Sequence, residues 1–465
     1  MMQKPDDTRP RSPAAGPVSA PGGWPVVGHA PALLTRRLEF LSSLAAVGEV
    51  VRIRLGPVPA YVVTHPALVR RLLVPGDQHY DRGLLMEKSS TWFGDSLLTS
   101  YGESHRRQRR ALRSAFTGEH LAAHVRRVRD ETQKVVGSWT PGRAFALDEH
   151  MNDLALTSVA RSLFSTGLTT EKLASIRHHM PVLFRGVLAR TAMPNGWDRL
   201  PTPGNLRFRT SMRAMDALVN DVITARRAEH PDPEAPGDVL TSLLAVRDDN
   251  GAALSVRAVR DQVMTLLVAG SETTGAVLTW ALYEIFRHPP IEDAVRRELD
   301  EVLGNRDLTL ERLSSLTYLE KVISETVRRY PVPFIMRRTL RPVRLGEVDL
   351  PAHAEIVFSP YILHHDRRWF PQPRQFDPDR WSPDRSDPPA KDAYIPFGAG
   401  VHVCIGRRMA LAAIATSLAV ICSTQRLEPA ADRPIREVAT GTVHPDRMPM
   451  IPRPVSPTGV GRATR

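Results

Sequence analysis

The pattern of apolar and polar positions divides the chain into a short strand-forming region, a long helical region and a mixed C-terminal region. The runs 50–55 (VVRIRL) and 60–64 (AYVVT) flank a GPVP turn and predict a β-hairpin. Between 102 and 330, apolar residues recur with helical spacing, interrupted by Pro-containing breaks. After 331, prolines and short strand-like runs take over. We therefore predict one mainly α domain with a small β portion.

The first 25 residues differ in composition from the rest of the chain. They are rich in Pro, Gly and Ser and carry few large apolar side chains. Such a segment cannot bury enough apolar surface to fold. We therefore predict a flexible tail over 1–25 and a single folded domain over 26–465.

The most apolar stretch, 264–287, is long enough to cross a bilayer. Glu272 lies near its middle and Glu284 follows, and carboxylates are costly inside a membrane. The stretch is therefore predicted to be a buried core helix, and we expect no membrane anchor.

Charge and cysteine content narrow the class of protein. The 465 residues carry a formal net charge of +12, which would suit a nucleic acid, an anionic membrane or an acidic protein partner. The chain has two cysteines and no secretory signal, so it lacks a disulfide framework and we predict a cytoplasmic protein.

The stretch 394–411 (YIPFGAGVHVCIGRRMAL) places Cys404 between a glycine-containing loop and an apolar run with helical spacing. A lone cysteine is more often an inert core residue than a ligand. Here Gly398 and Gly400 allow a tight turn, so that a flat group can approach the backbone. The N-terminus of a helix also favours a thiolate, which is the form that binds iron.

This stretch matches the signature F-G-x-G-x-H-x-C-x-G of the cytochromes P450 at Phe397, Gly398, Gly400, His402, Cys404 and Gly406. The chain therefore resembles the haem-thiolate monooxygenases. The resemblance implies a single-domain cytochrome P450 fold that holds haem b between a long central helix and the helix after Cys404. It further implies that Cys404 is the axial iron ligand, that His402 hydrogen-bonds a haem propionate and that Phe397 and Gly406 contact the haem. Cys422 matches nothing and is predicted to be core.

A second motif lies in 266–278 (LLVAGSETTGAVL). In a plain buried helix, Gly270 and Gly275 would each cost about 1 kcal/mol relative to Ala, and a buried Glu would cost several kcal/mol more. The segment resembles the family's oxygen-binding groove, A/G-G-x-D/E-T-T/S, at Ala269, Gly270, Ser271, Glu272, Thr273 and Thr274. The resemblance implies that Ala269 and Gly270 contact the haem, that Gly270 leaves room for dioxygen, and that Glu272 and Thr273 deliver protons to it.

Glu325 and Arg328 lie three apart on one face of the predicted helix 319–331. Alone, such a pair is most often a surface ion pair worth well under about 1 kcal/mol. The pair resembles the family's E-x-x-R helix, and FDPDRW at 376–381 resembles its later Arg-bearing turn. The resemblance implies that Glu325, Arg328 and Arg380 form a buried structural triad.

His105 and Arg109 lie on one face of the basic run 102–112, which could also be a solvated helix face. By the resemblance, both contact haem propionates, as does Arg337, with Arg338 as the alternative. The outward basic side chains are predicted to form a patch near the thiolate made of Arg106, Arg107, Arg110, Arg407 and Arg408. An acidic ferredoxin or flavodoxin is the expected partner at this patch, with electrons supplied by NAD(P)H through a separate ferredoxin and reductase.

The segments that the family layout places in the substrate cavity are apolar, which favours a hydrocarbon-like ligand, although each residue could equally be core packing. The predicted pocket residues are Leu85, Met86, Phe93, Phe184, Met264, Val268 and Phe334. The chain also resembles actinobacterial monooxygenases of terpenoid and antibiotic biosynthesis. This resemblance implies a sesquiterpene such as pentalenene as substrate, with a fatty acid or a polyketide as the alternative.

Two rival classes share parts of this pattern. A haem-thiolate peroxygenase replaces the acid and alcohol pair with Arg and Pro, so Glu272 and Thr273 argue against it. A non-enzymatic haem sensor or electron carrier needs no proton relay. We therefore predict a monomeric, haem-dependent monooxygenase that binds an apolar small molecule and no nucleic acid.

Overall fold

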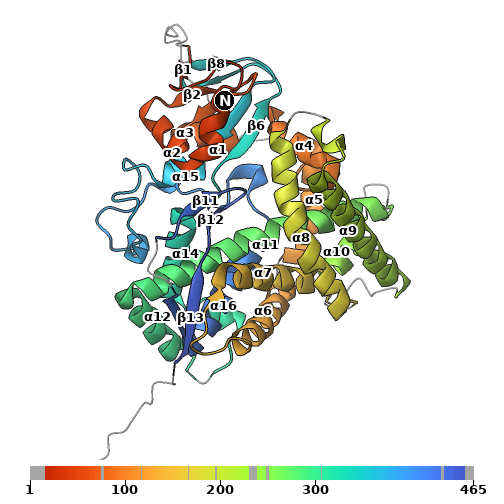
Figure 1. The fold of residues 1–465 in the computed structure, drawn as a ribbon, viewed down its shortest axis with the longest axis vertical. Coiled ribbons are helices and arrows are strands. Elements are labelled where there is room, and N and C mark those ends of the chain that lie inside the picture. The colour runs from red at the N-terminus through yellow and green to blue at the C-terminus, as the bar shows by residue number, and fades with distance from the viewer. Residues whose placement is uncertain are drawn as a thin grey trace, which may run out of the picture.

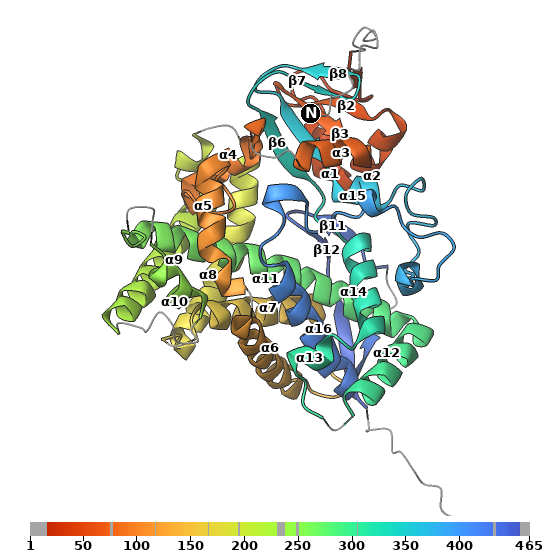
Figure 2. The same cartoon turned by 180° about the vertical axis from the view of Figure 1, so that it is seen from behind.

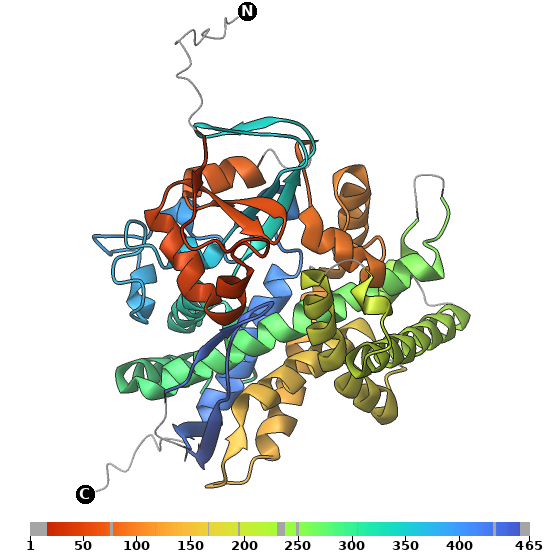
Figure 3. The ribbon, with the colours of Figure 1, turned by 45° about the horizontal axis from the view of Figure 1, so that its top comes forward.

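Helix α11 (Val256–Arg287) runs through the middle of the molecule, and other helices surround it (Figure 1, Figure 3). The structure is a computed structural model that describes residues 16–74, 78–116, 118–165, 167–193, 196–229, 238–247, 251–304, 306–430 and 434–455. The other helices are α1 (Ala30–Thr35), α2 (Arg37–Ser43), α3 (Pro66–Leu73), α4 (Gly83–Phe93), α5 (Gly102–Leu112), α6 (Glu119–Gly137), α7 (Leu147–Leu163), α8 (Thr170–Ala192), α9 (Pro203–Ala228), α10 (Val239–Ala245), α12 (Pro289–Val302), α13 (Leu310–Leu313), α14 (Thr317–Arg329), α15 (Pro360–His364) and α16 (Arg407–Thr424).

The strands gather mainly into one mixed sheet with the order β1-β2-β3-β9-β6-β4, beside a three-stranded sheet β10-β13-β5 and the hairpins β7-β8 and β11-β12. Their bounds are β1 (Val18–Ser19), β2 (Val50–Leu55), β3 (Val58–Val63), β4 (Tyr80–Asp81), β5 (Phe145–Ala146), β6 (Ile335–Thr339), β7 (Val343–Leu345), β8 (Val348–Leu350), β9 (Glu355–Phe358), β10 (Gln425–Pro429), β11 (Glu437–Ala439), β12 (Val443–Pro445) and β13 (Pro449–Pro454). The predicted hairpin is confirmed, because β2 pairs antiparallel with β3.

The predicted tail over 1–25 differs from the structure at its C-terminal end. Val18 and Ser19 form strand β1, which pairs in parallel with β2, so the folded domain begins before residue 26. Backbone pairing holds this strand although Val18 is exposed, and such pairing leaves no mark in the composition. Residues 1–15 of the predicted tail lie outside the described residues.

The most apolar stretch is a core helix, as predicted. Within α11, Leu267, Leu278 and Leu282 are fully buried, and the Ser255 side chain caps the helix by accepting a hydrogen bond from the backbone N–H of Ala258. In the described part of the chain, α16 is the helix long and apolar enough to span a membrane, and half of it is buried inside the protein. Figure 2 shows α16 beside α11 near the centre of the molecule.

Candidate active site

A cavity of about 420 Å³ lies between α11 and the loop that precedes α16. Cys404 lines it from the loop, and Ala269, Gly270 and Thr273 line it from α11. The structure therefore brings the two motifs together, although they lie more than a hundred residues apart in the sequence.

Local backbone geometry sets the position of Cys404. Gly398 and Gly400 have φ of 71° and 68°, a region that favours glycine. A Cβ at Gly400 would lie 2.0 Å from the carbonyl oxygen of Leu73, so the loop packs against α3 at a distance that excludes any side chain. The backbone N–H of Cys404 donates to the carbonyl of Phe397 at 2.9 Å. Cys404 thus presents its side chain to the cavity, whereas Cys422 is buried in the core, as expected.

The thiol of Cys404 is subject to opposing influences. Burial raises its pKa above the ordinary value, while backbone N–H groups of Gly406 and Arg407 and the charge of Arg109 act to lower it. The backbone N–H groups at the start of α16 thus lower the pKa of Cys404 as expected, but burial raises it by more. A cation bonded to the sulfur would therefore be the main stabiliser of the thiolate.

One wall of the cavity carries a cluster of basic side chains, which we call the cationic wall: Arg82, His105, Arg109, Arg337 and His402. His402 Nδ1 lies 3.1 Å from His105 Nε2. Burial, followed by the neighbouring arginines, lowers the pKa of His402 strongly. Burial also lowers the pKa of Arg337 to about 10.

The arginines of the cationic wall have neutral partners. Arg109 donates to the carbonyl of Val403 at 2.7 Å, Arg82 to that of Leu98 at 2.9 Å and Arg337 to that of Met336 at 2.8 Å. None of them takes part in an ion pair with any described carboxylate. Buried guanidinium groups are costly without an anion. The wall therefore fits a ligand with carboxylates, such as the two propionates of haem, while Cys404 supplies a thiol for its iron.

The structure separates the two arginines that the sequence left as alternatives. Arg338 points to acidic partners instead of the cavity, since its guanidinium contacts Asp81 at 2.7 Å and also bonds Glu87. Arg337, the neighbouring residue on β6, lines the cavity. Arg82 was missed by sequence reasoning, because it belongs to no motif and enters the wall only through the pairing of β4 with β6.

Ser271, Glu272 and Thr273 of α11 form a group that we call the polar notch, and its two hydroxyls are bonded within their own helix. Thr273 Oγ1 donates to the carbonyl of Ala269 at 2.8 Å, and Ser271 Oγ donates to that of Leu267 at 2.7 Å. Because the proton of Thr273 is engaged, its oxygen is left to accept a hydrogen bond on the cavity side.

The glycines of this helix serve close packing against α7. A Cβ on Gly270 would lie 3.0 Å from Val159, and one on Gly275 would lie 2.2 Å from the side-chain oxygen of Asn152. Gly270 and Val159 both line the cavity, and that Gly270 leaves room for dioxygen stays a prediction.

Glu272 is a carboxyl group that stays protonated at neutral pH. Burial raises its pKa to about 8, although the nearby hydroxyls of Thr442 and Thr440 and the charge of Arg185 act to lower it. Thr442 Oγ1 donates to Oε1 at 3.0 Å. Glu272 therefore has a partner that the sequence did not indicate.

Glu325, Arg328 and Arg380 form a compact cluster of buried charges. Arg328 contacts Glu325 at 2.7 Å, and Arg380 contacts the same carboxylate at 3.3 Å. Each of the three side chains is at most 1% exposed. The alternative of a surface ion pair is thereby excluded. The remaining guanidinium protons go to backbone carbonyls, which include those of His364 and Pro371.

The predicted substrate residues do not line this cavity. Phe93, Met264 and Val268 are buried in the hydrophobic core formed with α7, α9 and α10. Leu85 and Phe334 pack at the edge of the core beneath β2 and β3. The remaining two, Met86 and Phe184, are partly buried and likewise absent from the lining.

The error for α11 is one of helical phase. The lining residues Leu266, Ala269 and Thr273 follow one stripe of the helix. Met264 and Val268 share the neighbouring stripe, which faces the core instead of the cavity. Apolar lining of the cavity comes from other positions, among them Leu97, Leu98, Val277, Val332 and Ile335.

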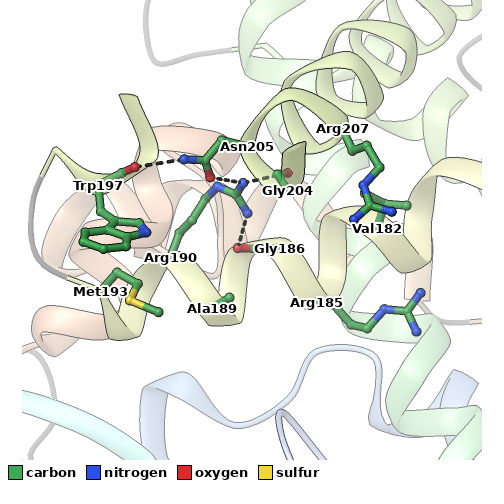
Figure 4. A pocket seen from close by; sticks show the side chains of 10 residues that line it. All are labelled: Val182, Arg185, Gly186, Ala189, Arg190, Met193, Trp197, Gly204, Asn205 and Arg207. Carbon is green, nitrogen blue, oxygen red and sulfur yellow. Dashed lines mark hydrogen bonds between the residues drawn. The ribbon is translucent and has the colours of Figure 1, made fainter. Parts of the chain in front are cut away.

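A second pocket, of about 480 Å³, lies on the surface between α8 and α9 (Figure 4). Arg190 crosses it and donates to the carbonyl of Gly186 at 2.9 Å and to that of Gly204 at 3.1 Å. Its guanidinium also lies 3.9 Å from the ring centre of Phe208. Arg190 is therefore a packing residue of this helix pair, and no predicted catalytic or haem-binding residue lines the pocket.

The fold and the cavity define the class, and comparison with known proteins agrees. The cytochrome P450 family model matches residues 18–449, and this chain belongs to that family. The cytochrome P450DA heme domain shares the fold with a TM-score of 0.84, over 96% of this chain and 99% of that chain, at 21% identity. The predicted fold and family are thus confirmed.

Three of the similar curated proteins are enzymes of Streptomyces. Cyclooctat-9-en-7-ol 5-monooxygenase of Streptomyces melanosporofaciens is 41% identical, over 88% of this chain and 89% of its own length. Pentalenene oxygenase of Streptomyces avermitilis is 36% identical, over 92% of this chain and 96% of its own length. Cyclooctatin synthase of Streptomyces melanosporofaciens is also 36% identical, over 94% and 95%. The prediction of a monooxygenase agrees with these names.

Proposed function

We propose that this protein is a haem-dependent monooxygenase that hydroxylates a cyclic terpene or terpene alcohol. One observation carries the proposal: a single cavity combines the Cys404 thiol, the cationic wall, the Thr273 hydroxyl of α11 and Thr442, whose hydroxyl binds the Glu272 carboxyl. A non-enzymatic haem carrier would need the thiol and the wall but not the buried acid and hydroxyl.

The chain's own residues would hold the haem from two sides. Cys404 would bind the iron, and Arg82, Arg109 and Arg337 would bind the propionates together with the His105 and His402 pair. When bound, the haem would supply activation of dioxygen and insertion of one oxygen atom into a C–H bond. NAD(P)H, acting through a separate ferredoxin and reductase, is the proposed source of electrons.

Glu272 and Thr273 of α11 would take part in proton transfer. Glu272 is protonated at neutral pH and can donate, because its pKa is raised to about 8. Thr273 Oγ1 already donates to Ala269, so it would accept a hydrogen bond and orient a protonated group without releasing a proton of its own.

The substrate class is supported by the relatives and by the apolar share of the cavity lining. The names of two relatives specify a terpene alcohol and a terpene hydrocarbon. We therefore propose cyclooctat-9-en-7-ol and pentalenene as the first two test ligands, with a fatty acid as the alternative. A change of haem spin state on adding either terpene supports the class, and a change with the fatty acid alone contradicts it.

The redox partner would dock where α5 and the Cys404 loop meet. The bond from Arg109 to Val403 joins these elements, and Arg106, Arg107, Arg110, Arg407 and Arg408 are all exposed. Glu103 partly neutralises the patch, since it lies 2.9 Å from Arg106 and 3.8 Å from Arg110. The surplus of positive charge suits an acidic ferredoxin or flavodoxin.

The decisive experiment is a difference spectrum of the reduced protein with carbon monoxide, for the wild type and for Cys404→Ser. We expect a thiolate-type spectrum in the wild type and its loss in the variant. Cys422→Ser is the matched control and should leave the spectrum unchanged. A thiolate-type spectrum that persists in Cys404→Ser contradicts the proposal.

A further inference from the structure

The turn of the β11-β12 hairpin contacts the polar notch of α11. Thr442, in this turn, is 5% exposed and lines the cavity. Its hydroxyl donates to Oε1 of Glu272 at 3.0 Å, across 170 positions of sequence. The other carboxyl oxygen, Oε2, is buried and has no hydrogen-bond partner among the described residues. The two oxygens of one carboxyl group therefore have different environments.

The turn is fixed in place from several sides. The backbone N–H of Thr440 donates to the carbonyl of Thr442 at 2.9 Å, and the Trp280 indole N–H donates to the carbonyl of Val443 at 2.9 Å. Arg37 of α2 donates to the carbonyl of Ala439 on the other strand. These bonds fix the Thr442 hydroxyl before any ligand binds.

The tip of the turn also packs tightly. A Cβ on Gly441 would lie 2.6 Å from the ring of Phe184 on α8, so glycine allows the close approach. The turn therefore packs between α8 and α11.

We propose that Thr442 is the positioning residue for the Glu272 carboxyl: it binds Oε1 and so assigns Oε2 as the atom that holds and exchanges the proton. An oxygen that accepts a hydrogen bond keeps the carbonyl role, and the O–H forms on the other oxygen. In each cycle the Oε2–H bond breaks as the proton passes to a water molecule, and a proton taken from another water re-forms it, so the carboxyl group ends the cycle protonated. This inference rests on the proposed function.

The groups around Glu272 determine how the hydrogen bond from Thr442 changes the pKa of its carboxyl group. Thr442 and Thr440 from the turn and Arg185 from α8 all lower its pKa, and burial raises it. Removing the Thr442 hydroxyl therefore moves the pKa of Glu272 further upward. A carboxyl that cannot ionise near neutral pH delivers its proton less readily, so the hydroxyl keeps Glu272 within its working range.

The first test is an infrared titration of the holoenzyme, which needs no substrate. The carbonyl band of protonated Glu272 is assigned by its absence in Glu272→Gln. We expect Thr442→Val to shift the midpoint of this band upward by about one pH unit, the size of one hydrogen bond to a charged group. Thr442→Ser should stay close to the wild type because it keeps the hydroxyl.

The second test is the pH profile of coupling, measured as product formed per NAD(P)H consumed with cyclooctat-9-en-7-ol or pentalenene. Thr442→Val should lose about tenfold in coupling and release hydrogen peroxide, whereas Thr442→Ser should recover it. Thr279→Val is the matched control. Thr279 is a buried threonine of α11 whose hydroxyl donates to the carbonyl of Gly275 and to no other described residue, so its loss should leave the profile unchanged.

The outcomes separate this inference from the proposed function. A normal carbon monoxide spectrum together with unchanged midpoint and coupling in Thr442→Val overturns the role of Thr442 alone. An abnormal spectrum in the wild type overturns the proposed function instead. If Thr442→Val does not fold, Thr442→Ala removes the same hydroxyl without adding atoms and gives the same readouts.

Discussion

Two clusters of buried charge in this protein, the Glu325 triad and the cationic wall, differ in one respect. The Glu325 carboxylate faces the guanidinium groups of Arg328 and Arg380. The remaining N–H groups of these two arginines donate to backbone carbonyls. In the cationic wall, Arg109 and Arg337 donate to backbone carbonyls and form no ion pair with a described carboxylate. A charge cluster that serves the fold contains its own counter-charge, whereas one that serves a ligand is left without one.

We expect the largest loss of stability from a substitution in the Glu325 cluster. Glu325→Ala leaves Arg328 and Arg380 buried without a counter-charge, which costs about 3–5 kcal/mol of stability. We expect a strong fall in the midpoint of thermal unfolding and little haem in the purified protein. Glu320→Ala, a change at an exposed position of the same helix, is the control. Equal stability of the two variants would contradict the structural role of the triad.

The cationic wall should respond in the opposite way. Arg337→Met removes a buried charge that lacks a carboxylate partner, so the haem-free protein should be as stable as the wild type or more so. Haem affinity should fall about tenfold to a hundredfold, the worth of a charge-assisted hydrogen bond. Haem transfer to apomyoglobin measures the affinity. Arg338→Met, at the adjacent ion-paired residue, should leave haem transfer unchanged.

Glu272 extends the comparison to a carboxyl group that forms no ion pair with any described basic side chain. Its pKa in the folded state, about 8, is above the ordinary 4.5. Its contribution to stability is therefore fully present below the ordinary pKa and is lost as pH rises through the folded value. The free energy of unfolding of the wild type should fall relative to Glu272→Gln by a few kcal/mol over this range. Denaturant titrations at several pH values would measure it, and parallel curves for the two proteins would contradict it.

The smallest effect on stability is expected at the surface patch, where charge is solvated. Arg107→Glu should leave unfolding unchanged but slow the association of an acidic ferredoxin by about tenfold at low salt. The difference should shrink as ionic strength increases. Arg207→Glu, on α9, is the control. Stopped-flow reduction measures the rate, and a salt-independent rate would rule out electrostatic docking.

The sequence predicted a feature when the residues that form it lie close together along the chain. The Cys404 loop, the α11 notch and the Glu325 helix are contiguous, so fixed spacing was sufficient. Arg82 and Thr442 were missed because each reaches the cavity through a strand pairing or a turn from distant chain. The substrate residues Met264 and Val268 were misplaced because apolar residues cover most of α11, and apolarity then gives no helical phase.

The bond from Arg37 to Ala439 joins positions 402 residues apart and has a consequence for the order of assembly. By the time the ribosome has made α16, Cys404 and every residue of the cationic wall are already present. The hairpin that reaches Glu272 is translated afterwards and docks onto an arginine made near the start. The residues proposed for proton delivery are therefore completed later in synthesis than those proposed to hold haem, and a chain that stops before β11 would have every predicted haem contact but would lack the Thr442 partner of Glu272.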